Sequence, residues 1–206
     1  MAEFSYLTVA GPSSGLFKEK GSKFISFAYP VSSEIEVKKH LEALQKQYHD
    51  ATHHCFAWIL DADKQRYRAF DDGEPNHSAG DPILGQLRSR NLTNILVVVV
   101  RYYGGTKLGV SGLITAYRSA AQDALNKCTI VEKELLQALT FKFNYANTTE
   151  VMRLIKEFDL SILKQDFQLT CLIEANVKLS QKEKLGDKIA LLNATGSEIQ
   201  IEFEDA

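Results

Sequence analysis

The chain has 206 residues, of which 45% are hydrophobic and 24% are charged, which is an ordinary globular composition. Its net charge of -2 excludes a strong overall basic field that would draw it onto nucleic acid. Three widely separated cysteines, no signal-peptide pattern and no apolar run longer than residues 95–100 predict a cytoplasmic protein without disulfides or membrane contact.

The first part of the chain combines extended and helical patterns. Residues 1–30 indicate a strand, a turn at residues 11–15 and a second strand. Ser33 and Glu36 form a capping-box pattern, and the apolar spacing that follows predicts a helix as far as Tyr48.

Two more strands are predicted before the middle of the chain. Residues 53–60 are rich in aromatic side chains, and the period of two in a strand places His54 on one face and His53 on the other. A short helix with Pro82 in its first turn is expected next. Residues 94–102 are apolar on both faces, so this strand should be central and at least partly covered on both sides.

The organisation restarts at about residue 135. The predicted elements after that point are a strand (138–145), a helix (147–159), two strands (160–166 and 169–177), a helix (180–194) and a strand (198–203). This βαββαβ order predicts a ferredoxin-like domain. We therefore expect an α+β fold with two domains, residues 1–135 and 136–206, of which the second is the more acidic.

A glycine-rich loop joins the central strand to the next helix, for which Ser111 is the expected N-cap. Free N–H groups and the dipole at a helix N-terminus favour an anion, and glycines let the backbone approach one. The candidate residues for binding a phosphate group or the RNA backbone are Arg101, Gly104, Gly105, Lys107, Gly109 and Ser111. The alternative is a tight connection whose glycines serve only geometry. The loop is not a P-loop, because Val110 stands where that motif needs lysine.

Histidines and carboxylates offer weaker candidates. His54, Asp72 and Glu74 are possible general acid or base groups, whereas the alternatives are a structural histidine and turn carboxylates that cap backbone N–H groups. The His, Cys and Asp spacings match no standard zinc site, so no metal or other cofactor is expected.

Several short motifs fall in a consistent order over residues 17–127. They are residues 21–24 (GSKF), 53–57 (HHCFA), 72–75 (DGEP), 79–84 (AG-x-PIL), 92–94 (LTN), 101–109 (RYYGGTKLG), 112–113 (GL) and 116–117 (AY). Together they resemble the IMPACT/YigZ family, and the second half resembles the family's smaller C-terminal domain by pattern. One departure is Asn76-His77-Ser78, where the family usually has small residues and a threonine.

The resemblance implies a first domain like the second domain of ribosomal protein S5 and domain IV of the translocating elongation factor. It implies a second domain like domain V of that factor. Eukaryotic members of the family restrain activation of a translation-initiation-factor kinase by competing for its co-activator. They do so with an additional N-terminal RWD domain, for which about twenty residues before the first motif leave no room, so that role is not expected to carry over directly.

Three classes of function remain open from the sequence. The first is a non-catalytic regulator of translation that binds RNA, the ribosome or a translation-associated protein. The second is an enzyme that acts on a phosphorylated small molecule or nucleotide through the glycine-rich loop, because the same S5-like topology occurs in small-molecule kinases. The third is a module that mainly binds other proteins. The sequence leaves the oligomeric state undetermined.

Overall fold

The computed structural model describes residues 4–168 and 170–204. The described chain forms two compact units. Residues 6–133 make up the N-terminal unit, and residues from 134 onward make up the C-terminal unit together with residues 4–5. No helix in the described ranges has the length and apolar composition needed to cross a lipid bilayer. The assignment of domains to residues 1–135 and 136–206 stays a prediction.

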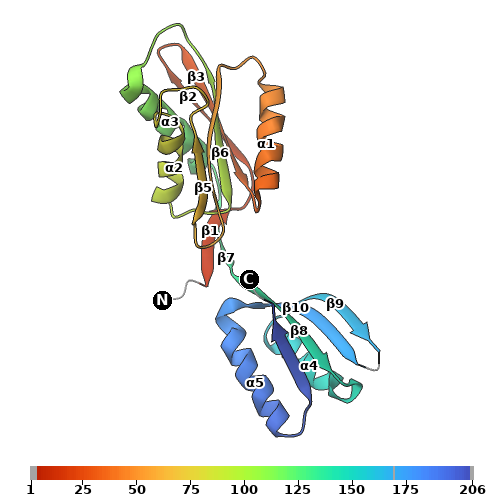
Figure 1. Cartoon of the computed structure of the whole chain (residues 1–206). Coiled ribbons are helices and arrows are strands. Elements are labelled where there is room, and N and C mark those ends of the chain that lie inside the picture. The colour runs from red at the N-terminus through yellow and green to blue at the C-terminus, as the bar shows by residue number, and fades with distance from the viewer. Residues whose placement is uncertain (1–3, 169, 205–206) are drawn as a thin grey trace. The chain divides into compact units, whose positions relative to one another are not determined.

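The N-terminal unit is a five-stranded antiparallel sheet with helices on both faces (Figure 1). In spatial order its strands are β2 (Ser13–Glu19), β3 (Ser22–Pro30), β6 (Ile95–Tyr102), β4 (His53–Leu60) and β5 (Arg66–Phe70). Helix α1 (Glu34–Gln47) covers one face, and α2 (Gly80–Ser89) and α3 (Gly109–Asn126) cover the other. The predicted central strand is confirmed, since β6 lies in the middle and residues 95–100 are fully buried.

Alternation along β4 divides its side chains between two apolar cores. Cys55 and Ala57 belong to the core under α2 and α3, whereas Phe56 and Trp58 belong to the core under α1. The prediction that neighbouring residues of this strand face opposite sides is therefore confirmed, and it separates His53 from His54.

Three strands were not predicted, namely β2, β5 and β7 (Ile130–Glu134). Residues 11–15 were expected to be a turn, but β2 already begins at Ser13, because Gly15 lies against α3 where a Cβ would come within 2.5 Å of the Ala124 nitrogen. The Ser13 hydroxyl also donates to the Ala124 carbonyl at 2.8 Å. The second missed strand is β5, which forms a hairpin with β4. At β2, contacts distant in sequence override the local turn signal.

The helix starts agree in part with the sequence. The Ser33 hydroxyl accepts from the Glu36 N–H at 3.3 Å, so the predicted N-cap of α1 is confirmed. Helix α3 instead begins at Gly109, and its N-cap is Leu108, which makes no side-chain capping bond. The prediction of Ser111 as N-cap is wrong, because the left-handed backbone of Gly109 (φ 71°) turns the chain into the helix two residues earlier. A separate two-stranded sheet pairs β1 (Ser5–Val9) with β7 (Ile130–Glu134).

The C-terminal unit has the predicted ferredoxin-like order. Its elements are β8 (Leu136–Phe143), α4 (Thr148–Glu157), β9 (Ser161–Phe167), β10 (Cys171–Lys178), α5 (Lys182–Ala194) and β11 (Ile199–Phe203). The antiparallel sheet runs β11-β8-β10-β9, the ferredoxin-like arrangement. One core takes side chains from this sheet, α4 and α5. The α+β prediction is confirmed for the chain.

Candidate functional site

The glycine-rich loop, residues 103–108, is packed tightly onto the turn between β2 and β3. A Cβ on Gly104 would lie 1.9 Å from the Gly21 carbonyl carbon, and the Gly104 N–H donates to the Ser22 hydroxyl at 3.1 Å. Gly105 has a left-handed backbone with φ 85° and an open surrounding. These glycines are therefore required by close approach and backbone geometry whether or not a ligand binds.

Arg101 points into the protein and away from solvent. Its side chain is 6% exposed, and Nη1 donates to Oε1 of Glu74, which is equally buried. The guanidinium also stacks over the Phe24 ring at 5.3 Å and the Tyr103 ring at 5.6 Å. Its positive charge is thus matched by a carboxylate inside the unit, and a contact between Arg101 and an anion stays a prediction.

Glu74 is the centre of a buried polar group that we call the Glu74 cluster, consisting of Glu74, Arg101, Tyr117 and His53. The Tyr117 hydroxyl donates to Glu74 Oε1 at 2.7 Å, and His53 Nε2 lies 3.8 Å from the same oxygen. Tyr117 comes from α3, Arg101 from β6 and His53 from β4. The cluster therefore ties the segment before α2 to the sheet and to α3.

His53 is the member of the Glu74 cluster that reaches solvent, with a side chain 19% exposed. Its Nδ1 lies 2.7 Å from the Asp72 carbonyl oxygen, which only accepts, so Nδ1 carries the proton and Nε2 faces Glu74. The sequence analysis selected His54 instead. Strand register would have indicated His53, because it pairs directly with Arg101 across β4 and β6.

The three residues predicted as general acid or base groups do not converge. His54 lies on the opposite face of β4 from Glu74, and its buried Nε2 has no hydrogen-bond partner among the described residues. Burial lowers the pKa of His54 against the opposing effect of Asp72. Asp72 accepts from the His54 backbone N–H at 2.6 Å and so fixes the turn. A role of His54, Asp72 and Glu74 in acid–base chemistry stays a prediction.

The segment before α2 is organised by Asp71. One carboxylate oxygen accepts from the N–H groups of Ala79 and Gly80 at 2.9 and 2.8 Å, and the other accepts from His77 at 2.9 Å. His77, the residue that departs from the family pattern, has φ 64° and an exposed ring 2.6 Å from Asp81. This ring lies at the surface, so His77 does not narrow the Glu74 cluster.

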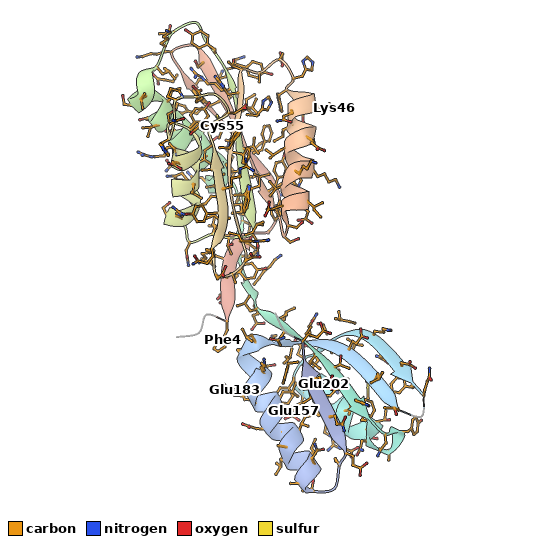
Figure 2. The ribbon with its side chains drawn as sticks, viewed as in Figure 1. Phe4, Lys46, Cys55, Glu157, Glu183 and Glu202 are labelled. Atoms are coloured by element: carbon orange, nitrogen blue, oxygen red, sulfur yellow. The ribbon has the colours of Figure 1, made fainter. Side chains whose placement is uncertain are left out.

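Cys55 lies beneath the Glu74 cluster in the layer between the sheet and α2 and α3 (Figure 2). Its thiol donates to the Asp71 carbonyl at 3.0 Å and lies 3.3 Å from the Tyr117 hydroxyl. Burial raises the pKa of Cys55 and that of Tyr117 far above their usual values. Both groups therefore stay protonated at neutral pH, and Cys55 is not a thiolate nucleophile.

Charged and aromatic side chains gather at the end of the sheet that carries the loop. Lys20 extends from the β2–β3 turn, Lys23 from the start of β3, and Tyr103 and Lys107 from the loop, all exposed. Because the loop and the turn are packed together through Gly104, these four residues lie at the same end of the sheet, which we call the loop end. A hollow of about 310 Å³ beside it is lined by residues that include Lys20, Ser111 and Gly112.

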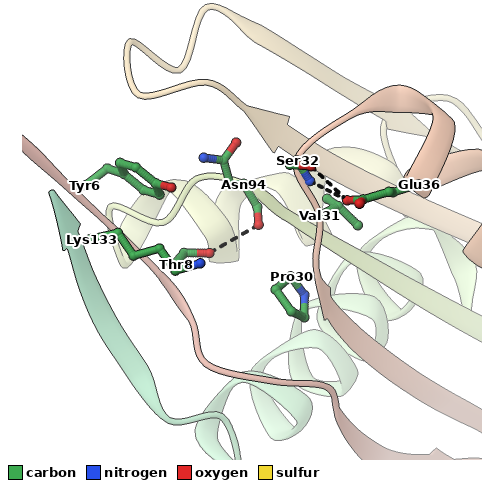
Figure 3. A pocket seen from close by; sticks show the side chains of 8 residues that line it. All are labelled: Tyr6, Thr8, Pro30, Val31, Ser32, Glu36, Asn94 and Lys133. Carbon is green, nitrogen blue, oxygen red and sulfur yellow. Dashed lines mark hydrogen bonds between the residues drawn. The ribbon is translucent and has the colours of Figure 1, made fainter. Parts of the chain in front are cut away.

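A second hollow lies near β1 and β7 (Figure 3). It measures about 200 Å³, and its lining includes Tyr6, Asn94, Glu36 and Lys133. None of the catalytic or anion-binding residues predicted from the sequence lines this hollow. Among the described side chains, no three His, Cys, Asp or Glu residues gather in a way that would hold a metal ion.

Fold and site together define a two-unit α+β protein, in which an antiparallel sheet with a glycine-rich strand-to-helix loop precedes a ferredoxin-like unit. The Impact N-terminal domain family matches residues 20–125. IMPACT family member YigZ of Escherichia coli K12 is 33% identical over 188 residues, which cover 90% of this chain and 92% of that protein. The chain belongs to the IMPACT family.

Two further comparisons agree with this assignment. IMPACT family member YvyE of Bacillus subtilis 168 is 36% identical over 141 residues, which cover 68% of this chain and 65% of that protein. A crystal structure described as that of a hypothetical protein superimposes with a TM-score of 0.76 at 31% identity, over 97% of both chains. The similarity to this structure extends through both units.

Proposed function

We propose that this chain is a non-catalytic regulator of translation that binds RNA, the ribosome or a translation-associated protein. The loop end of the N-terminal unit is the proposed contact surface. Membership of the IMPACT family supports the link to translation, since the resemblance implies that role for eukaryotic members and a fold akin to ribosomal and elongation-factor domains. A likeness in fold to ribosomal and elongation-factor domains is only an analogy. The proposal therefore depends on the residues of the loop end.

The observation that carries the proposal is the composition of the loop end. Lys20, Lys23 and Lys107 are exposed on two segments that Gly104 locks together, and Tyr103 beside them is 47% exposed. Lysines attract phosphate groups, and an exposed aromatic ring stacks on unpaired bases. The backbone that carries these side chains is already held in place by packing. Binding to a folded RNA surface would therefore require little further ordering of the backbone.

The Glu74 cluster supports a non-catalytic role. Oε1 of Glu74 already accepts from Arg101 and Tyr117, and the nearby thiol of Cys55 is held protonated by burial. A general base must reach its substrate, whereas the Glu74 side chain is only 5% exposed. The cluster is better suited to holding the loop end in position.

Binding to RNA alone should be weak. Three lysines give few phosphate contacts, and the chain as a whole has a net charge of -2. The sheet of the C-terminal unit adds no stacking platform, because Thr140, Lys142, Leu172 and Glu174 occupy its uncovered face. A protein component of the target is therefore expected to supply much of the affinity.

Co-sedimentation with ribosomes over a salt series tests the proposal. Replacing Lys20, Lys23 and Lys107 together by alanine should weaken binding at least tenfold at low salt and flatten its salt dependence. The matched control replaces three exposed lysines of α1, Lys38, Lys39 and Lys46, and should bind like the unchanged protein. Equal binding by both triple variants would contradict the proposed surface.

A second candidate is an enzyme acting on a phosphorylated small molecule or nucleotide. The specific observation in its favour is the hollow of about 310 Å³ beside the N-terminus of α3, where Leu108 provides no side-chain cap for the free N–H groups. Screening nucleotides and sugar phosphates by thermal shift tests it. A stabilisation that Ser111→Pro abolishes would favour this candidate, and no shift at about 100-fold the expected dissociation constant would exclude it.

A further inference from the structure

Strand β9 lies at the edge of the C-terminal sheet (Figure 1). It pairs with β10 on one side, and no described strand pairs with its outer side. An edge strand presents unpaired N–H and C=O groups, which form a template for another strand. The outer edge of β9 is therefore a place where a further strand can add to the sheet.

The side chains of β9 make this edge unusually apolar for one exposed to water. Leu163 is 61% exposed and Phe167 is 45% exposed. Between them, Lys164 and Asp166 are separated by Gln165 and pair with Glu174 and Leu172 of β10, so the two charges share one face of the strand, whereas Phe167 pairs with Cys171 on the other face. Strand β9 therefore carries exposed apolar side chains and two opposite charges within a short segment.

We propose that β9 is a self-association surface, through which a second copy of this chain adds its own β9 in antiparallel pairing. A two-fold axis perpendicular to the sheet must pass through one residue, because paired residues in antiparallel strands face the same side. With the axis at Gln165, Lys164 lies opposite Asp166 of the second copy.

Charge selects this register over its neighbours. An axis one residue earlier would put Lys164 opposite its own counterpart, and an axis one residue later would do so for Asp166. Like charges directly opposite each other are destabilising, whereas opposite charges are favourable. Within its own chain Lys164 lies 3.6 Å from Glu174, so in the dimer it would lie between two carboxylates.

The other edge strands of the two larger sheets cannot form such an opposite-charge pair. This holds for the described residues, 4–168 and 170–204. An opposite-charge pair across such an axis needs an acid and a base an even number of residues apart. Strand β5 holds only basic charges, Arg66 and Arg68, and β11 holds only Glu202. Strand β2 holds Lys18 and Glu19, which are adjacent and so face opposite sides.

The expected association is weak and reversible. A β-bulge at Leu163 ends the regular part of β9, so the four residues Lys164–Phe167 of each copy take part. Such a contact falls in the small class of interfaces. Sedimentation equilibrium on the full chain should therefore show a monomer–dimer equilibrium at concentrations of roughly 100 µM.

Two charge variants and their mixture test the register. Lys164→Asp makes both charges of the segment acidic, and Asp166→Lys makes both basic. Each variant alone should associate at least about tenfold more weakly than the unchanged chain, because like charges then face each other. An equimolar mixture should regain association close to that of the unchanged chain, because every pair across the axis is again opposite in sign.

The control carries the same charge change away from the edge. Lys142→Asp alters an exposed lysine of the inner strand β8 and should leave association unchanged. A chain that stays monomeric at the highest concentration reached, or a mixture no tighter than its two components, would overturn the proposal. Equal weakening by Lys142→Asp and Lys164→Asp would overturn it too, because net charge and not pairing would then control association.

Discussion

Arg101 and Glu74 form a buried ion pair in the N-terminal unit, with side chains 6% and 5% exposed. The pair joins the central strand β6 to the segment before α2, which are 27 residues apart in sequence. Tyr117 donates to the same carboxylate oxygen at 2.7 Å. A charge at this depth is tolerated only with its partner, so either residue depends on the other.

Replacing Arg101 by alanine is expected to lower the free energy of unfolding by about 3–5 kcal/mol, because Glu74 is left as an uncompensated buried charge. Urea unfolding followed by circular dichroism measures the change. The control Arg118→Ala removes an exposed arginine from α3 and should alter stability by no more than about 0.5 kcal/mol.

Removing both charges gives the complementary result. Arg101→Met together with Glu74→Gln should cost much less than the sum of the two single changes, since neither charge is then left alone. Additive losses would show that the two residues act independently, contrary to the observed contact.

The fold could be predicted largely from periodicity. The unbroken apolar run of β6 identified the central strand, and the alternation of apolar positions gave the βαββαβ order of the C-terminal unit. Strand β2 escaped prediction because glycine, proline and serine gave a local turn signal at residues 11–15. The packing of Gly15 against α3, more than a hundred residues later, decides its conformation.

The candidate site was less predictable. From the sequence, Glu74 and Arg101 are predicted separately and for different roles. Their pairing is a tertiary contact between residues 27 positions apart, and residue spacing does not reveal it. Choosing His53 over His54 requires knowing which face of β4 meets Arg101. Only the strand register, in which His53 pairs with Arg101, gives this information. For the glycines of the loop, a geometric role was one of two interpretations that the sequence left open, and the close contact of Gly104 with Gly21 was not predicted.

Gly104→Ala is expected to destabilise the N-terminal unit by about 1–3 kcal/mol, because the added Cβ would meet backbone atoms of Gly21 and Ser22 at 1.9 and 2.2 Å. Thermal and urea unfolding report the loss. Gly85→Ala in α2 is the control, since nothing lies within 4 Å of its Cβ position. That change should raise stability by roughly 0.4–1 kcal/mol, as expected for an unobstructed helical site.

The stability of the chain should fall as the pH drops below about 6.5, in part through His54. Burial holds the pKa of His54 below its ordinary value of 6.5, so the unfolded chain binds more protons between the two values. The stability from the neutral ring is full above pH 6.5 and declines as the pH falls toward the folded-state pKa.

Urea unfolding at a series of pH values between 8 and 5 tests this dependence. His54→Gln cannot titrate, so its unfolding free energy should change less over that range than that of the unchanged chain. His40, whose pKa is also lowered by burial, contributes with the same sign, so His40→Gln should flatten the profile further. An unaltered slope in His54→Gln would contradict the assignment.

Cys55 should resist alkylation in the folded chain. The thiolate is the reactive form, and burial raises the pKa of Cys55 while its thiol donates to the Asp71 carbonyl. Cys128 is only partly buried, so iodoacetamide at pH 8 should modify Cys128 well before Cys55, as peptide mass spectrometry would show. In urea all three cysteines should react at similar rates, because the difference arises from burial alone. Modification of Cys55 as fast as Cys128 in the native protein would mean that the layer beneath the Glu74 cluster opens readily to solvent.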